Sequence, residues 1–187
     1  MFPRNLQTIF LDRDGILNQK APEGAYVARW EEFRILPGVP EAIACLNRAG
    51  LLVVVVSNQR GIARGLYTAS DVESMHERFQ ELLKPHGAHI DAFFICPHEE
   101  SECNCRKPLT GMFDQATARF PAISAATSVM IGDSAADIEF GRRLGMATIF
   151  VGGDPVLHKP GTAAAGASAN LCCNSLLEAV GVLLAAN

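Results

Sequence analysis

The chain has 187 residues, of which 49% are apolar, and this length suits one well-packed domain better than two. Its 16 lysine and arginine residues against 20 acidic residues give a net charge of −4, which argues against a nucleic-acid or anionic-membrane partner. No stretch approaches the roughly 18 uninterrupted apolar residues of a membrane span, and residues 1–5 carry no apolar signal segment. We expect a single cytoplasmic domain over residues 1–187 that works as a monomer.

The first strong signal is the apolar run 8–11, which two carboxylates, Asp12 and Asp14, and a glycine follow. A β-branched, apolar run without alternation predicts a buried strand. In α/β proteins, functional groups lie just beyond the carboxyl ends of such strands, so this acidic turn is the first candidate for a site. Residues 13–37 show no helical period and are predicted to form a long loop or small flap over it.

The rest of the chain alternates between strand and helix patterns, which predicts a doubly wound parallel sheet of the α/β class. Four consecutive valines at 53–56 indicate a strand that is buried on both faces. Residues 152–169, rich in glycine, proline and alanine, are predicted to be a loop. Strands are expected at 51–56, 91–95, 128–131, 147–151 and, at an edge, 171–173, and helices at 39–49, 68–84, 111–120, 135–144 and 176–186.

Further polar side chains follow the later predicted strands: Ser57, Lys107, and the pair Asp133 and Asp137. Together with the acidic turn, and in this order, they resemble the four motifs of the haloacid dehalogenase-like phosphatases over about residues 8–151. The resemblance implies a Rossmann-like sheet and an Mg²⁺-dependent phosphatase in which Asp12 attacks phosphorus and forms an aspartyl-phosphate. Asp14 would then be the general acid and base, with a pKa above that of Asp12.

Phosphoryl transfer requires positioning and charge neutralisation, and the remaining motif residues suit those tasks. The resemblance implies that Ser57 and backbone amides near Asn58 hold the phosphoryl oxygens, and that Lys107 balances negative charge. Mg²⁺ would take oxygen ligands from Asp12, Asp133 and the backbone carbonyl of Asp14, with Asp137 orienting the hydrated ion. The structural alternatives are that Ser57 is a turn cap and Asp137 an exposed helix residue.

Three cysteines and one histidine crowd into ten positions: Cys96, His98, Cys103 and Cys105. This ligand set suits a tetrahedral, closed Zn²⁺ site with a structural role. Lys107 lies two positions after the last ligand, so the metal would fix this cation at the site. The alternative is a group of free cysteines beside an unrelated histidine.

Within the superfamily, residues 12–18, 57–65 and 106–108 and the cysteine loop resemble the D-glycero-D-manno-heptose 1,7-bisphosphate phosphatases and the related histidinol-phosphatases. The heptose branch implies removal of the 7-phosphate from a small phosphorylated sugar. The short intervals between the motifs leave no room for a large cap domain, so the site should be open. The expected substrate-binding residues are Asn58, Gln59, Arg60, Arg64 and Arg106.

Two positions depart from the heptose pattern. Arg60 stands where a small serine is usual, and Ser134 stands where a lysine or arginine commonly follows the Gly-Asp pair. We expect Arg60 to supply the positive charge that Ser134 lacks. Histidinol-phosphate phosphatase, polynucleotide 3′-phosphatase, a non-catalytic phospho-receiver domain and a purely structural zinc module remain alternative functions.

Overall fold

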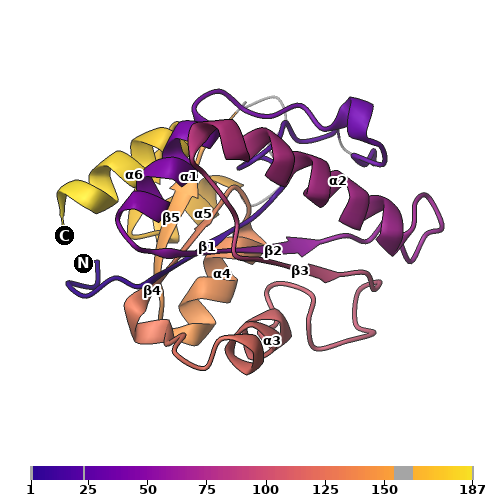
Figure 1. Cartoon of the computed structure of the whole chain (residues 1–187). Helices are drawn as coiled ribbons and strands as arrows, with labels where there is room; N and C mark the ends of the chain where they lie inside the picture. The colour runs from indigo at the N-terminus through magenta and orange to yellow at the C-terminus, as the bar shows by residue number, and fades with distance from the viewer. Residues whose placement is uncertain (1, 23, 154–161, 187) are drawn as a thin grey trace.

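A computed structural model describes residues 2–22, 24–153 and 162–186 of the chain. Its strands form one parallel sheet in the order β3-β2-β1-β4-β5-β6 (Figure 1), which confirms the predicted doubly wound architecture and the edge position of the last strand. The strands are β1 (Thr8–Leu11), β2 (Leu52–Asn58), β3 (Ala92–Cys96), β4 (Ser128–Gly132), β5 (Ala147–Val151) and β6 (Leu171–Cys173).

Helices cover both faces of this sheet. One face packs against α1 (Val39–Arg48), α2 (Ala69–Leu83) and α6 (Leu176–Ala185), and the other against α3 (Gly111–Arg119), α4 (Ala135–Leu144) and α5 (Thr162–Ser168). Strand β1 shows why its sequence lacks alternation: Ile9 and Leu11 enter the first core, whereas Phe10 enters the second. None of the described helices is long and apolar enough to cross a membrane.

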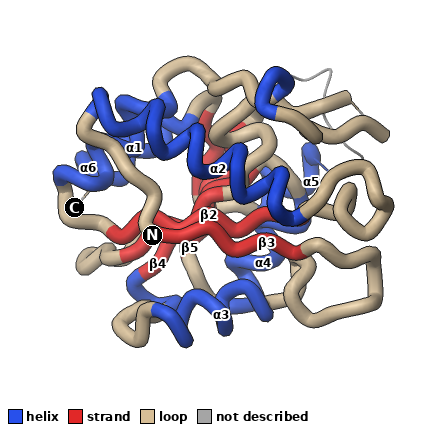
Figure 2. The backbone as a smooth tube through the Cα atoms, turned by 45° about the vertical axis from the view of Figure 1, so that its right-hand side comes forward, coloured by secondary structure: helices blue, strands red, loops and turns tan. Residues whose placement is uncertain are grey.

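The central strand sets the level of the predicted motif residues. Leu11 of β1 pairs with Val55 of β2 on one side and with Ile131 of β4 on the other. The residues just beyond these three positions therefore reach the same edge of the sheet. In Figure 2 the loop that follows β3 projects beyond the end of that strand.

The segment 13–37 is a loop, as predicted, apart from the single 3₁₀ turn η1 (Trp30–Glu32). Trp30 stacks on Phe33 at a ring-centroid separation of 5.4 Å, and Phe33 lies at the same separation from Phe79 of α2. These ring contacts fasten the loop to α2, which supports the preceding loop residues beside the site.

The prediction of a loop over residues 152–169 is wrong for its second half. Residues 162–168 form α5, and Ala165 is buried there against Ile138 and Phe150. Composition alone favoured a loop, but alanine has the highest helix propensity, and the buried alanine supplies a packing face. Residues 154–161 lie outside the described residues. Two further 3₁₀ turns, η2 (Lys84–His86) and η3 (Ala125–Thr127), complete the described secondary structure.

Candidate active site

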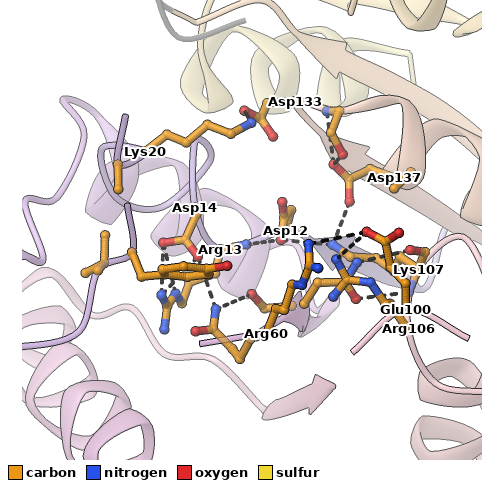
Figure 3. A pocket seen from close by; sticks show the side chains of 18 of the residues that line it. Asp12, Arg13, Asp14, Lys20, Arg60, Glu100, Arg106, Lys107, Asp133 and Asp137 are labelled. Atoms are coloured by element: carbon orange, nitrogen blue, oxygen red, sulfur yellow. Dashed lines mark hydrogen bonds and ion pairs between the residues drawn. The ribbon is translucent and has the colours of Figure 1, made fainter. Parts of the chain in front are cut away.

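A pocket of about 810 Å³ opens where β1, β2 and β4 end. Asp12, Ser57 and Asp133 from these strand ends line it together with Lys107, which the loop after β3 carries (Figure 3). Residues 20–22 and 24–27 form another wall. The pocket is open as expected, because its outer walls are loops and the described residues include no cap domain.

Three carboxylates meet in this pocket. Asp12, Asp133 and Asp137 each place an oxygen within 4.8 Å of the other two. Asp137 is fully buried in the first turn of α4, so its alternative interpretation as an exposed helix acid is wrong. Gly132 permits this approach, because a Cβ at that position would lie 2.2 Å from Cβ of Asp137. Carboxylates this close together in a buried site need positive charge beside them.

Lys107 supplies positive charge from inside the protein. Its buried Nζ lies 2.9 Å from Oδ1 of Asp12 and 2.6 Å from Oδ1 of Asp137, and donates a 2.7 Å hydrogen bond to the carbonyl of Val56. Burial opposes the charge, but the two carboxylates outweigh it and raise the pKa of Lys107 above its ordinary value. The Asn58 side chain grips the Lys107 backbone, accepting from its N–H at 2.9 Å and donating to its carbonyl at 3.0 Å.

Gln59 lies beneath the acidic turn and is almost completely buried. Its Nε2 donates to Oγ of Ser57 at 2.8 Å and to Oδ2 of Asp14 at 3.1 Å, and its Oε1 accepts from the Tyr67 hydroxyl at 2.8 Å. The side-chain amides of Asn58 and Gln59 therefore bond to other residues of the protein. In this structure the two side chains position Lys107, Ser57 and Asp14, whereas the sequence predicted that they contact the substrate. Tyr67 has no counterpart among the predicted residues, and no local spacing points to it.

Asp14 is surrounded by hydrogen-bond donors. The buried guanidinium of Arg13 contacts both of its oxygens, with Nη2 at 3.0 Å from Oδ1 and 2.9 Å from Oδ2, and Nδ2 of Asn18 donates to Oδ1 at 2.9 Å. Burial raises the pKa of Asp14, but the charge of Arg13 and the hydrogen bonds from Asn18 and Gln59 outweigh it and hold the pKa below its usual range.

Asp12 has the opposite balance. Burial first, and then the nearby Asp137, raise the pKa of Asp12 to about 7 against the opposing charge of Lys107. The expectation that Asp14 has the higher pKa is therefore wrong for the protein groups by themselves. The reason is that Asp14 has its own guanidinium in Arg13, whereas Asp12 shares one ammonium with another carboxylate.

Lys20 is a site residue that the sequence interpretation missed. It extends from the loop after β1, and its ammonium contacts Oδ2 of Asp133 (Figure 3). The adjacent Ser134 caps α4, where its hydroxyl donates to Oδ2 of Asp137 at 2.5 Å. Lys20 is thus the cation that contacts Asp133, the residue before Ser134, whereas Arg60 pairs with Glu99 and Glu100. The expectation that Arg60 supplies the charge that Ser134 lacks stays a prediction.

The three predicted substrate-binding arginines are held by acids of the cysteine loop. Nε of Arg60 lies 2.5 Å from Glu99, and Nε of Arg64 lies 2.8 Å from the same carboxylate. Glu100 approaches Arg60 at 3.5 Å and Arg106 at 3.8 Å. Arg60, Arg64 and Arg106 all line the pocket, so the structure brings them together on one wall.

The cysteine loop gathers its four predicted ligands. The sulfur atoms of Cys96 and Cys103 are 3.5 Å apart, and those of Cys103 and Cys105 are 3.3 Å apart. Nδ1 of His98 lies 3.4 Å from Cys105 and 3.8 Å from Cys96. A tetrahedral Zn²⁺ with Zn–S bonds of about 2.3 Å and Zn–N bonds of about 2.0 Å separates its ligand atoms by roughly 3.5–3.8 Å, close to the separations in this cluster, so these four residues could hold the ion.

The carboxylate cluster is suited to a hard cation. Oδ1 of Asp133 is buried and has no hydrogen-bond partner in the described part of the chain. Asp12 lies beside it with Oδ1 in contact with Lys107, whereas both oxygens of Asp137 are engaged, by Lys107 and by Ser134. Gly15, with φ +96°, allows the acidic turn to close against Asp133, because a Cβ there would lie 2.3 Å from its Oδ2. This donor set fits Mg²⁺, which prefers oxygen ligands.

Comparisons with known proteins identify relatives of this chain. Residues 104–179 match the HAD-hydrolase-like family model. The chain is 36% identical over 171 residues to the D-glycero-alpha-D-manno-heptose-1,7-bisphosphate 7-phosphatase of Mycobacterium tuberculosis, which covers 91% of this chain and 87% of that protein. It is 39% identical over 157 residues to the beta-heptose counterpart of Pseudomonas putida, with 83% and 84% covered.

A solved structure gives the same result for the fold. The D,D-heptose 1,7-bisphosphate phosphatase of B. bronchiseptica, determined with magnesium and phosphate, superposes with a TM-score of 0.86 at 33% identity and covers 97% of this chain and 100% of that one. Identity above 30% over most of both chains, with the motif residues gathered in one pocket, decides the family. The chain belongs to the haloacid dehalogenase-like hydrolases, in the family of the D-glycero-D-manno-heptose 1,7-bisphosphate phosphatases.

Proposed function

We propose that this protein is an Mg²⁺-dependent phosphatase that removes the 7-phosphate of D-glycero-D-manno-heptose 1,7-bisphosphate through an aspartyl-phosphate intermediate. The observation that carries this proposal is the position of Asp12, whose carboxylate lies in an open pocket within reach of Lys107 and Asp133. A carboxylate nucleophile needs positive charge beside it, because it must approach a phosphate that repels it; Lys107 supplies such charge, and Asp133 can hold a cation. The heptose bisphosphatases named above support the substrate class.

Asp12 attacks phosphorus and the sugar oxygen leaves, and water then releases phosphate from Asp12. Asp14 protonates the leaving oxygen in the first step and takes a proton from water in the second. The contact with Arg13 keeps Asp14 a carboxylate, which suits the second step. A phosphate dianion that enters beside Asp14 would raise its pKa by like-charge repulsion and so favour the protonated form for the first step.

Mg²⁺ would bind Asp12, Asp133 and the backbone carbonyl of Asp14, with Asp137 beside it. When bound, it neutralises phosphate charge and orients the phosphoryl oxygens. Lys107 holds the charge of Asp12 and Asp137, and Ser57 faces the phosphoryl group from β2. Zn²⁺ in the cysteine loop would have a structural role, because four protein ligands leave no open position.

The substrate is recognised by the wall of arginines. Arg60, Arg64 and Arg106 can grip the phosphate that is not cleaved, since guanidinium groups bind phosphate oxygens in pairs. Single-domain organisation and a monomeric state complete the proposal. The relatives divide between the alpha and beta anomers, so both anomers belong in the test.

The test is phosphate release with Mg²⁺ from both heptose bisphosphate anomers, histidinol phosphate and a 3′-phosphorylated oligonucleotide. We expect kcat/KM for one heptose anomer to exceed that for histidinol phosphate at least about a hundredfold, because only the bisphosphate engages the arginine wall. Faster turnover of histidinol phosphate would replace the proposed substrate. Absence of turnover with every phosphate monoester would contradict the enzyme assignment.

Lys20→Met should increase the affinity for Mg²⁺ in the absence of substrate. The Lys20 ammonium contacts Asp133, so it repels a second cation at this carboxylate and occupies one of its oxygens. Because the pair is largely buried, removing the charge should tighten Mg²⁺ binding by about two- to tenfold, as measured by calorimetry. Lys84→Met, which removes an exposed ion pair with Glu81, is the control and should leave the affinity unchanged.

The raised pKa of Asp12 predicts how the free energy of unfolding depends on pH when EDTA is present. Its raised pKa, about 7, means that the folded protein retains a proton between pH 4 and pH 7 that the unfolded chain releases. Its contribution to the free energy of unfolding should therefore fall as pH rises through this window, by at most about 1.4 kcal/mol per pH unit. Denaturant titrations of the wild type and Asp12→Asn at pH 4.5, 6 and 7.5 measure it as their difference, in which the titration of groups remote from Asp12 cancels. Parallel pH profiles would contradict the prediction.

A further inference from the structure

The arginine wall of the pocket already contains carboxylates. Glu99 and Glu100 lie between two proposed metal ligands, His98 and Cys103, and the loop brings both acids to the arginines. Figure 3 shows Glu100 beside Arg60 and Arg106, at a distance from the contact between Lys20 and Asp133. An anionic group of the protein thus contacts the same guanidinium groups that a second substrate phosphate would use.

The two acids hold the arginines with unequal strength. Glu99 is 28% exposed and contacts Arg60 and Arg64 at 2.5 and 2.8 Å. Glu100 is 69% exposed and stands 3.5 and 3.8 Å from Arg60 and Arg106. Exposed ion pairs at such separations contribute little, whereas short contacts to a shared carboxylate fix the side chains. Glu99 is therefore a support for the arginines, and Glu100 is readily displaced.

The net charge of the three arginines and two glutamates also indicates that Glu100, and not Glu99, is the acid that a substrate displaces. Three guanidinium groups with two carboxylates have a net charge of +1, and withdrawal of Glu100 raises it to +2, which matches a phosphate dianion. Next to Glu100, Ser101 has φ +67°, a left-handed conformation that is unfavourable for a residue other than glycine. A small change of this turn would carry Glu100 away from the pocket while the adjacent Glu99 stays with its arginines.

We propose that Glu100 is an internal competitor for the subsite of the uncleaved phosphate, and that it determines how strongly the enzyme prefers bisphosphates. This rests on the proposed function, because it assumes a substrate with a second phosphate. A bisphosphate gains the contacts to Arg60 and Arg106 but must displace Glu100. A monophosphate reaches Asp12 without displacing it.

Glu100→Gln tests this, because it keeps the size of the side chain and removes the competing charge. We expect the KM for heptose bisphosphate and the inhibition constant of the product heptose 1-phosphate both to fall by about two- to tenfold. The kcat, and the KM for p-nitrophenyl phosphate, should be unchanged. The gain should shrink as NaCl is raised from 0.02 to 0.5 M, since salt screens exposed charges.

Glu102→Gln is the matched control: Glu102 lies in the same loop, and the ion pairs of Arg60, Arg64 and Arg106 in the described structure are with Glu99 and Glu100. Its carboxylate accepts from the backbone N–H of Glu99 at 3.1 Å, which the amide oxygen of a glutamine can also do. An equal gain in this variant, or in Glu99→Gln, would overturn the assignment to Glu100 in favour of the general charge of the loop. An unchanged KM and inhibition constant in Glu100→Gln, with a wild type that hydrolyses the bisphosphate, would refute the competitor alone. A wild type without bisphosphatase activity would instead refute the proposed function.

Discussion

Asp12→Asn should lose phosphatase activity, with kcat lower by on the order of 10⁴-fold or more, while the protein remains folded. An amide is not a nucleophile toward phosphorus, and both oxygens of the neighbouring Asp137 are engaged by Lys107 and Ser134. The substitution also removes like-charge repulsion with Asp137, the second cause of the raised Asp12 pKa. Phosphate release and the melting temperature in EDTA measure the two effects.

Asp14→Asn separates the two halves of the same reaction. With p-nitrophenyl phosphate, whose leaving group needs little protonation, Asp12 should still be phosphorylated, but water attack should lack its base. The expected result is a burst of about one p-nitrophenolate per enzyme followed by slow turnover. Asp114→Asn, an exposed substitution in α3, should behave as wild type. Steady turnover by Asp14→Asn without a burst would remove Asp14 from the acid–base role.

Cys105→Ser should abolish stoichiometric zinc binding, lower the melting temperature and reduce kcat by about 10²-fold or more. Cys105 is buried and precedes Arg106 and Lys107, so the cluster determines where the charge-balancing ammonium lies. Two hydrogen bonds from the Asn58 side chain also hold the Lys107 backbone. Without the metal, they alone would have to keep Lys107 in place against the motion of the loop. Zinc content by elemental analysis and phosphate release measured on the same sample check both parts.

Zinc chelation provides the kinetic side of this prediction. If the metal is structural, activity should decline slowly under a strong chelator and in step with the loss of folded protein. Cys172→Ser, on the edge strand β6 and remote from the cluster, should retain zinc and activity. Immediate inactivation with the fold intact would mean that the ion takes part in the chemistry, and zinc-free protein with full activity would show that the cluster is not a metal site.

The sequence predicted the sheet well because its strands are buried on both faces. The uninterrupted run at 53–56 can only be covered by helices on two sides, and the structure places two separate cores there. The helix at 162–168 departs from the predicted loop because the glycine and proline around it mask the helix propensity of its alanines. The motif positions could be recognised because they lie at or beyond the ends of strands, Asp12 and Asp133 directly after β1 and β4, Ser57 near the end of β2 and Lys107 in the loop after β3. The parallel register brings these strand ends together.

What the sequence determined by itself is therefore the fold class, the acidic turn at Asp12 and Asp14, and the compact cysteine loop, since each depends on residues close together in the chain. Only the tertiary structure decided how charge is shared. Lys20 reaches Asp133 across 113 positions, and Glu99 reaches Arg60 across 39. The pKa of Asp12 depends on its burial first, and then on Asp137 and Lys107, which the fold brings close to it from other elements. Electrostatic interactions act through space, so the order of pKa values and the partners of the arginines follow from distances that no local pattern encodes.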